Sequence, residues 1–247
     1  MKRRHIIILM LCLIAVKGWS GGPVHWLVID KQEMASDMAG LAKRFQHMKR
    51  YEVNVTHASF TDYKTDIAHQ SFKGYFKRNN EEFHNFLLGV QTIQTAKCKV
   101  VIDSERKVIA VADPISSLDS IMPVSDYTTT YKLCSSIKRS VIANRIYYRM
   151  EFKENYSVSA IELTVKDSLP EKIVMYYSKA VKQGGSSTKP RLEISFSNWN
   201  TKFSGDKEFF DIQKYLDNKG NQYFLKTPYA AKFKLLDERV LTRNAKK

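Results

Sequence analysis

The strongest constraint on the fold is a strict alternation of apolar and polar residues through residues 146–196. Four consecutive segments place an apolar side chain at every second position: Ile146, Tyr148, Met150 and Phe152; Ile161, Leu163 and Val165; Ile173, Met175 and Tyr177; and Leu192, Ile194 and Phe196. A period of two is that of a β-strand, whose side chains point alternately to two faces. Each segment has one apolar and one polar face, which is typical of an antiparallel sheet covered on one side.

The first half of the chain and its end predict further strands. Their residues are 51–56, a hairpin of 72–77 and 82–88 across polar residues 78–81, a second hairpin of 97–103 and 107–112, and one or two strands in 222–225 and 231–236. We therefore expect about 10 to 11 strands. An open sheet of that width tends to curl. The expected fold class is mainly β (α+β): a strongly curved antiparallel sheet or half-open β-barrel.

Two helices are expected to cover the apolar face of this sheet. Residues 30–50 carry Met34, Met38, Leu41, Phe45 and Met48 at spacings of four and three, which places them on one helical face. This methionine-rich stripe is either ordinary core packing or an adaptable surface for a ligand. Residues 131–144 predict the second helix, with Leu133, Ile137, Val141 and Ile142 on one side.

The N-terminus has the order of a secretory signal peptide. Three basic residues at 2–4 precede an apolar run at 6–16, and small residues suitable for cleavage follow. The run is shorter than the roughly 20 apolar residues that a membrane-spanning helix needs. We predict a signal peptide over residues 1–21 and a single domain over 22–247, with an uncleaved anchor as the alternative. Cys12 is interpreted as part of the apolar run.

The charge and the remaining cysteines leave alternatives open. A formal net charge of +15 favours anionic surfaces or partners, or else describes a well-solvated exterior. Export argues against a nucleic-acid partner, and the chain has no nucleic-acid-binding signature. Cys98 and Cys134 could form a disulfide, as exported proteins often do, or remain as two buried thiols.

Motifs for catalysis are missing from the sequence. The histidines have no metal-ligand spacing, and the chain contains no GxSxG, phosphate-binding loop or dinucleotide-binding fingerprint. We expect a protein that is not an enzyme and that uses no metal and no cofactor. A partly covered apolar face would instead suit acyl chains, since each buried CH₂ contributes about 0.8 kcal/mol.

Several segments together resemble the LolA-like family of outer-membrane lipoprotein carriers. They are residues 57–60 (HASF), 74–78 (GYFKR), Phe83, 101–108 (VIDSERKV) leading to 112–114 (ADP), 169–173 (LPEKI) and 194–199 (ISFSNW). The order of elements is also similar, because an exported chain opens with an amphipathic helix and continues into two β-meanders. The resemblance covers most of residues 30–238. One departure is Asn79, which stands where a proline usually follows the arginine.

The resemblance implies a half-open barrel with a helical lid and an apolar interior. Such carriers accept lipoproteins from an inner-membrane transporter and pass them to an outer-membrane receptor. In the family, an arginine after the glycine-aromatic strand hydrogen-bonds to the lid. Arg78 matches it best, with Lys77 as the rival register.

We therefore expect a monomeric periplasmic carrier that shields the acyl chains of lipoproteins. The residues expected to line its apolar cavity or lid are Met38, Leu41, Phe45, Phe72, Phe76, Arg78, Phe83, Phe86, Tyr148, Met150, Phe152, Ile161, Leu163, Met175, Ile194 and Phe196. The alternatives are a carrier of free lipid or glycolipid, and a non-catalytic envelope sensor or interaction domain.

The aromatic hairpin at residues 72–89 offers a test. Phe72 and Phe76, with Phe83 or Phe86, are expected to face the interior and touch cargo or lid. The alternative is that they form a packed core without a ligand. Phe76→Glu should abolish lipid binding if the cavity is real, whereas unfolding of that variant would favour a solid core.

Overall fold

The computed structural model describes residues 25–115, 130–183 and 186–239. Within them, one large sheet contains β1 (Leu27–Val28), β2 (Arg50–Phe60), β3 (Gln70–Asn79), β4 (Glu82–Leu87), β5 (Val90–Gln94), β6 (Lys99–Asp103), β7 (Val108–Ala112), β8 (Cys134–Ile142), β9 (Arg145–Phe152), β10 (Val158–Lys166), β11 (Leu169–Tyr177), β14 (Arg191–Asn200) and β17 (Lys234–Asp237). The predicted signal peptide, residues 1–21 with Cys12, lies outside the described residues.

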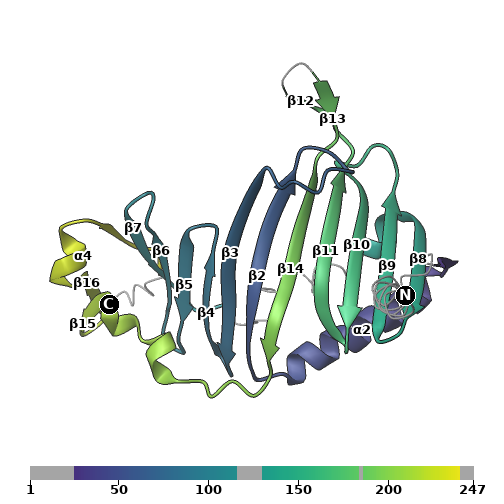
Figure 1. The fold of residues 1–247 in the computed structure, drawn as a ribbon. Helices are drawn as coiled ribbons and strands as arrows, with labels where there is room; N and C mark the ends of the chain where they lie inside the picture. The colour runs from purple at the N-terminus through teal and green to yellow at the C-terminus, as the bar shows by residue number, and fades with distance from the viewer. Residues whose placement is uncertain (1–24, 116–129, 184–185, 240–247) are drawn as a thin grey trace, which may run out of the picture.

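This 13-stranded sheet has the order β1-β8-β9-β10-β11-β14-β2-β3-β4-β5-β6-β7-β17. It is strongly curved and not closed, with β1 and β17 at its edges (Figure 1). Every neighbouring pair is antiparallel except β17 and β7, which are parallel. The predicted fold class is confirmed. The sheet is wider than expected because β1, β5 and β8 join it.

Helix α2 (Lys31–His47) forms where its sequence predicts. Its N-cap residue Asp30 accepts a hydrogen bond from the Glu33 amide at 2.7 Å. Met34, Met38, Leu41 and Phe45 are buried against the sheet. We call the sheet face under α2 the helix face and the opposite one the outer face. The methionine stripe is therefore core packing.

The predicted second helix over residues 131–144 is wrong. Tyr131–Leu133 forms one 3-10 turn, η2, and the chain then continues as strand β8. The four-residue spacing was misleading, because Ile137 is buried whereas Leu133 and Val141 are exposed. Pairing of β8 with β9, from Cys134 opposite Phe152 to Ile142 opposite Arg145, decided the structure.

The sheet has a core on each of its faces. The first, on the helix face, joins α2 to β2, β3, β8–β11 and β14. The second lies on the outer face of β5–β7 and includes Ile93, Val100, Ile109 and Val111. Cross-strand register proves the change of side: Phe76 of the first core stands opposite Asn85, whereas Ile93 stands opposite His84.

The second core is covered by residues 201–237, which we call the C-terminal lobe. It contains η3 (Lys207–Phe210), η4 (Ile212–Lys214), β15 (Leu216–Lys219), β16 (Gln222–Leu225) and α4 (Thr227–Ala230), and ends with β17. Strands β15 and β16 form a small sheet of their own. Leu216 and Tyr223 are the lobe's buried contributions to the core.

Cys98 and Cys134, the cysteines of the described residues, are free thiols. Cys98 is buried in the second core and Cys134 in the first, on opposite faces of the sheet. Of the two alternatives, the structure selects separate buried thiols. Burial raises the pKa of the Cys134 thiol to about 11, which keeps it protonated and unreactive.

Candidate functional site

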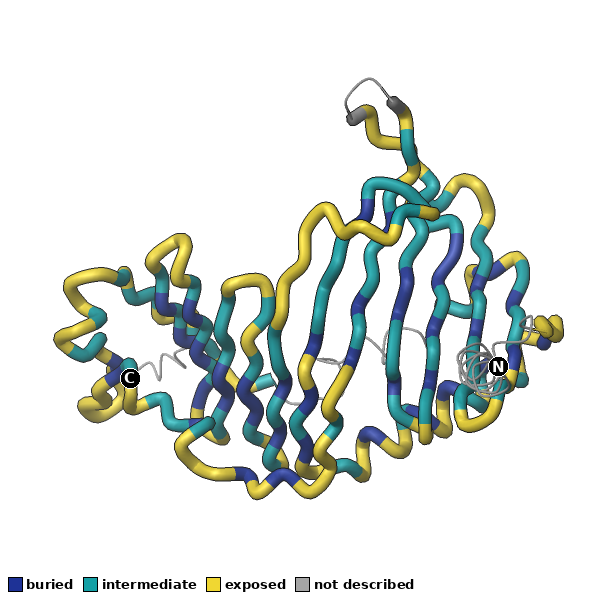
Figure 2. The backbone as a smooth tube through the Cα atoms, viewed as in Figure 1, coloured by how far each residue is buried: buried dark blue, intermediate teal, exposed yellow. Residues whose placement is uncertain are grey.

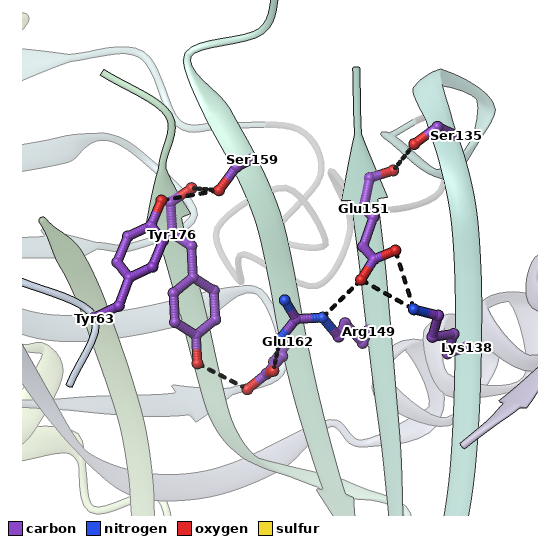
Figure 3. Close-up of polar contacts among 8 residues, drawn as sticks. All are labelled: Tyr63, Ser135, Lys138, Arg149, Glu151, Ser159, Glu162 and Tyr176. Atoms are coloured by element: carbon purple, nitrogen blue, oxygen red, sulfur yellow. Dashed lines mark hydrogen bonds and ion pairs between the residues drawn. The ribbon is translucent and has the colours of Figure 1, made fainter. Parts of the chain in front are cut away.

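The outer face of β8–β11 is polar, and its charged side chains pair with one another. Lys138 Nζ and Arg149 Nε lie 3.1 and 3.0 Å from the Glu151 carboxylate, and Arg149 also pairs with Glu162 (Figure 3). Tyr176 donates to Glu162 at 3.1 Å. Burial, and then Glu162, raises the pKa of Tyr176 to about 12, so it stays a donor. These paired charges do not form an apolar surface to which an acyl chain could bind.

The helix face is apolar, and α2 fills much of it. Most of the predicted site residues lie in this packed core, each at most 8% exposed: Met38, Leu41, Phe45, Phe76, Tyr148, Met150, Ile161, Leu163, Ile194 and Phe196. They pack against one another and against α2. Side chains of the helix and the sheet occupy the space around these residues, and their contact with a ligand stays a prediction.

Polar bonds fix α2 in this position. Arg139 of β8 donates to Asp37 at 3.0 Å and pairs with Glu33 at 2.5 Å, and Tyr148 donates to Asp37 at 2.9 Å. Burial, and then the Asp37 bond, raises the pKa of Tyr148. Beside the helix runs an open groove of about 490 Å³, lined by Gly40, Arg44 and His47 of α2 and by Ile146 and Val165 of the sheet.

Beyond α2 the apolar face continues and is only half covered. Phe72 is 44% exposed, and Met175 and Leu192 are half-buried while packing against the first core. Register places them side by side, since Phe72 faces His57, Leu192 faces Ser59 and Met175 faces Leu192. We call this set of Phe72, His57, Ser59, Leu192 and Met175 the open corner. Two of the predicted residues, Phe72 and Met175, belong to it.

His57 is the titratable side chain of the open corner. Burial lowers its pKa, so the neutral imidazole is favoured near neutral pH. The corner then presents an apolar surface with one neutral polar group. Phe152, another predicted residue, is half-buried farther along the same end of the sheet and stacks edge-on with Tyr156.

The hairpin aromatics divide between the two faces. Phe83 stands opposite Arg78 and shares the helix face with Phe72 and Phe76. Phe86 stands opposite Tyr75, whose ring stacks on it, and therefore lies on the outer face. A strand's alternation carries every second side chain to the other face, so Phe86 does not belong to the predicted interior.

Arg78 is buried on the helix face, at the end of β3. Its Nε donates to the Asn80 carbonyl at 3.0 Å, across the two-residue turn between β3 and β4. Asn80 adopts φ 56°, which asparagine tolerates well. Lys77, the rival candidate, points to the outer face and pairs with Glu52 at 3.1 Å.

A cluster on the outer face was not predicted from the sequence. His84 Nε2 lies 3.0 Å from Tyr75 Oη and 2.8 Å from Gln91 Nε2, and Gln91 accepts from Tyr215 of the C-terminal lobe at 3.2 Å. Burial, and then Lys77, lowers the pKa of His84 to about 4. Only the alternation along β4, which puts His84 on the side opposite Phe83, could have indicated this position.

The cluster fastens the C-terminal lobe to the sheet. Lys77 Nζ lies 3.6 Å from the Phe209 ring centre and 5.3 Å from that of Phe203. These contacts are structural. Among the described residues, no group of three or more histidine, cysteine, aspartate or glutamate side chains could hold a metal ion. No helix among them is long and apolar enough to cross a membrane.

Comparison with known proteins gives only distant likeness. No protein-family model matches the chain, and no curated protein matches it. Among solved structures, a DUF1329 family protein from Desulfovibrio piger is similar at 10% identity and TM-score 0.34, over 75% of this chain and 99% of that one. A putative outer membrane lipoprotein-sorting protein domain from Vibrio parahaemolyticus is similar at 8% identity and TM-score 0.27, over 74% and 98%. At these TM-scores the likeness does not place the chain in either family.

Proposed function

We propose that the protein is a non-catalytic carrier of the cell envelope that shields an acyl chain, that of a lipoprotein, against the open corner. The observation that carries the proposal is the apolar helix face, which continues past α2 into Phe72, Leu192 and Met175 without full cover. Because the outer face of β8–β11 carries paired charges, the helix face is the apolar side of this part of the sheet. The N-terminal sequence predicts a signal peptide, so we propose that the carrier acts in the periplasm.

The physics of burial favours a chain-like apolar ligand. Phe72, Leu192 and Met175 come from three different strands, so the corner is extended across the sheet. Each CH₂ removed from water contributes about 0.8 kcal/mol, so even a short contact with the corner gives measurable affinity. We expect no cofactor, a monomer, and exchange of cargo with membrane-bound donor and acceptor proteins.

The test is binding of an acylated peptide, with the non-acylated peptide of the same sequence as the reference ligand. Native mass spectrometry of the exported protein, with lipid extraction alongside, identifies what it already carries. We expect one acylated peptide per chain. Phe72→Ser should bind it about three- to ninefold more weakly, because a ligand can bury only the exposed 44% of a side chain whose full burial contributes roughly 1.5–3 kcal/mol.

Phe224→Ser is the matched control, because Phe224 is equally exposed, at 44%, but lies in the C-terminal lobe. It should bind as the wild type does. A stoichiometric free lipid or glycolipid in the exported protein would favour the alternative cargo. A protein that stays free of both, and ignores the acylated peptide, would overturn the carrier proposal in favour of an interaction domain.

A further inference from the structure

One end of the sheet carries a hairpin that projects beyond it. Strands β12 (Val181–Gln183) and β13 (Ser186–Thr188) pair only with each other, between β11 and β14 (Figure 1). The connection between β2 and β3, residues 61–69, leaves the sheet at the same end, because β14 pairs with both β11 and β2. We call residues 61–69 and the described part of 178–190 the projecting end.

The base of the projecting end is firmly held. Arg191 donates to the Asp62 carbonyl at 2.9 Å, and its guanidinium stacks 3.9 Å from the Phe60 ring centre. The Tyr177 amide donates to the Pro190 carbonyl at 3.0 Å, and Tyr63 donates to the Tyr177 carbonyl (Figure 3 shows the Tyr63 side chain). The loop and the hairpin therefore present their exposed side chains from one fixed base.

The exposed side chains of the projecting end include aliphatic and basic ones. Ile67 is 81% exposed and Val181 is 53% exposed. Lys179, Lys182 and Lys189 are all exposed, and the yellow tube of Figure 2 follows this part of the hairpin. From residue 172 to residue 192 the sequence has no aspartate or glutamate.

The two segments meet in space. An open groove of about 400 Å³ is lined by Val181 and Lys182 from the hairpin and by Thr61 and His69 from the loop. The acidic residues of the loop are Asp62 and Asp66, and the Asp62 carboxylate already accepts the amides of Lys64 and Thr65. The projecting end thus keeps an excess of positive charge around its exposed aliphatic side chains, Ile67 and Val181.

This chemistry fits a bilayer better than a protein partner. Specific protein interfaces are depleted in lysine and enriched in aromatic residues and arginine. A surface of anionic lipid, by contrast, attracts each nearby lysine without demanding a fixed geometry. Exposed aliphatic side chains beside basic residues are also the composition of segments that lie in the headgroup region of a membrane.

We propose that the projecting end docks on an anionic lipid bilayer, with Ile67 and Val181 entering the headgroup region and Lys179, Lys182 and Lys189 facing the lipid phosphates. The docking stands independently of the carrier function. If both hold, the open corner is turned toward the membrane, because Phe72 is the third residue of β3 and Leu192 the second residue of β14, and both strands begin at this end.

The test places an environment-sensitive fluorophore on a cysteine at Val181→Cys in the exported protein. Val141→Cys is the matched control, because Val141 is 63% exposed and lies at the end of β8 that is farther from the projecting end. Cys98 and Cys134 are buried and should not react. With vesicles of 30% phosphatidylglycerol in phosphatidylcholine, we expect a blue shift at position 181 and none at 141.

Charge variants complete the test through vesicle co-flotation at low salt. Lys179→Gln/Lys182→Gln/Lys189→Gln should bind the anionic vesicles at least about tenfold more weakly, given the contribution of each lysine near a membrane. Lys202→Gln/Lys207→Gln/Lys219→Gln removes the same charge from exposed positions of the C-terminal lobe and should bind as the wild type does.

Three results would overturn the proposal. They are equal loss of binding in both triple variants, a blue shift that is the same at positions 141 and 181, and a shift that persists undiminished with pure phosphatidylcholine. None of them bears on the acylated-peptide measurement, which uses no vesicles. Loss of vesicle docking with intact peptide binding would therefore leave the carrier function standing.

Discussion

At the scale of single residues, position on one or the other face decides what a side chain does. Phe72 and Phe76 share a strand and a face, yet Phe72 is half exposed in the open corner and Phe76 is buried under α2. Phe76→Glu would therefore bury a charge in the first core and unfold the protein, so it cannot report on ligand binding. A substitution at the half-exposed Phe72 can weaken ligand binding without unfolding the protein.

His84 makes the stability of the protein depend on pH. Its pKa in the folded state is about 4, below the 6.5 of an unfolded chain. The unfolded chain therefore takes up a proton first as the pH falls. We expect the full stability above about pH 6.5 and a loss of about 2 kcal/mol on the way to pH 4, after allowance for partial solvent screening.

Urea unfolding followed from pH 7.5 to pH 4 measures this loss. His84→Gln, which cannot take up a proton, should lose less stability over this range. His69→Gln is the control, because His69 is exposed and should change nothing. A curve for His84→Gln as steep as that of the wild type would show that the acid sensitivity lies elsewhere.

At the scale of elements, one close backbone approach shapes the sheet between β3 and β4. A Cβ on Gly74 would lie 2.1 Å from the Phe86 carbonyl oxygen, a distance that no side chain can occupy. The end of β4 therefore comes onto Gly74 from the helix face, at the strands where the buried face of the sheet changes sides. Glycine is needed here for space, and its φ is not positive.

Gly74→Ala should lower the free energy of unfolding by about 2 kcal/mol or more, because backbone would have to move away from the new methyl group. Gly40→Ala provides the contrast. Gly40 lies within α2 with nothing within 4 Å of the added Cβ, so alanine should raise stability by about 0.5–1 kcal/mol. Urea unfolding of both variants, with circular dichroism as the signal, would refute the idea if they behaved alike.

At the scale of the whole molecule, one sheet joins two cores that lie on opposite faces. Trp199 packs beside Phe45 and Tyr51 in the first core, with its indole donating to the Pro170 carbonyl at 3.0 Å. Leu216 is buried in the second core, in the C-terminal lobe. Because the strands are hydrogen-bonded continuously between the two regions, we expect both cores to unfold together.

Leu216→Ala tests this coupling and should cost about 3 kcal/mol, the usual range for a buried leucine. The fluorescence of Trp199, in a Trp19→Phe/Trp26→Phe background, should move to lower urea by the same amount as the circular dichroism. Phe224→Ala, at an exposed position of the lobe, should shift neither signal. A Trp199 transition that stays in place would show that the cores unfold separately.

Period and capping are local properties of the chain, so they were enough to predict the β-class of the fold, helix α2 and the four strands β9, β10, β11 and β14. The local pattern did not predict β8 (Cys134–Ile142), because residues 131–144 also satisfy a helical spacing. The side on which each strand is covered could not be predicted either: alternation along β4 puts Phe83 and Phe86 on opposite faces, but only the pairing with β3 shows that Phe83 takes the helix face and Phe86 the outer face. Burial depends on which elements meet in space, so only the folded structure shows that α2 covers most of the helix face and that, among the described residues, Phe72 stays 44% exposed and Leu192 and Met175 stay half-buried.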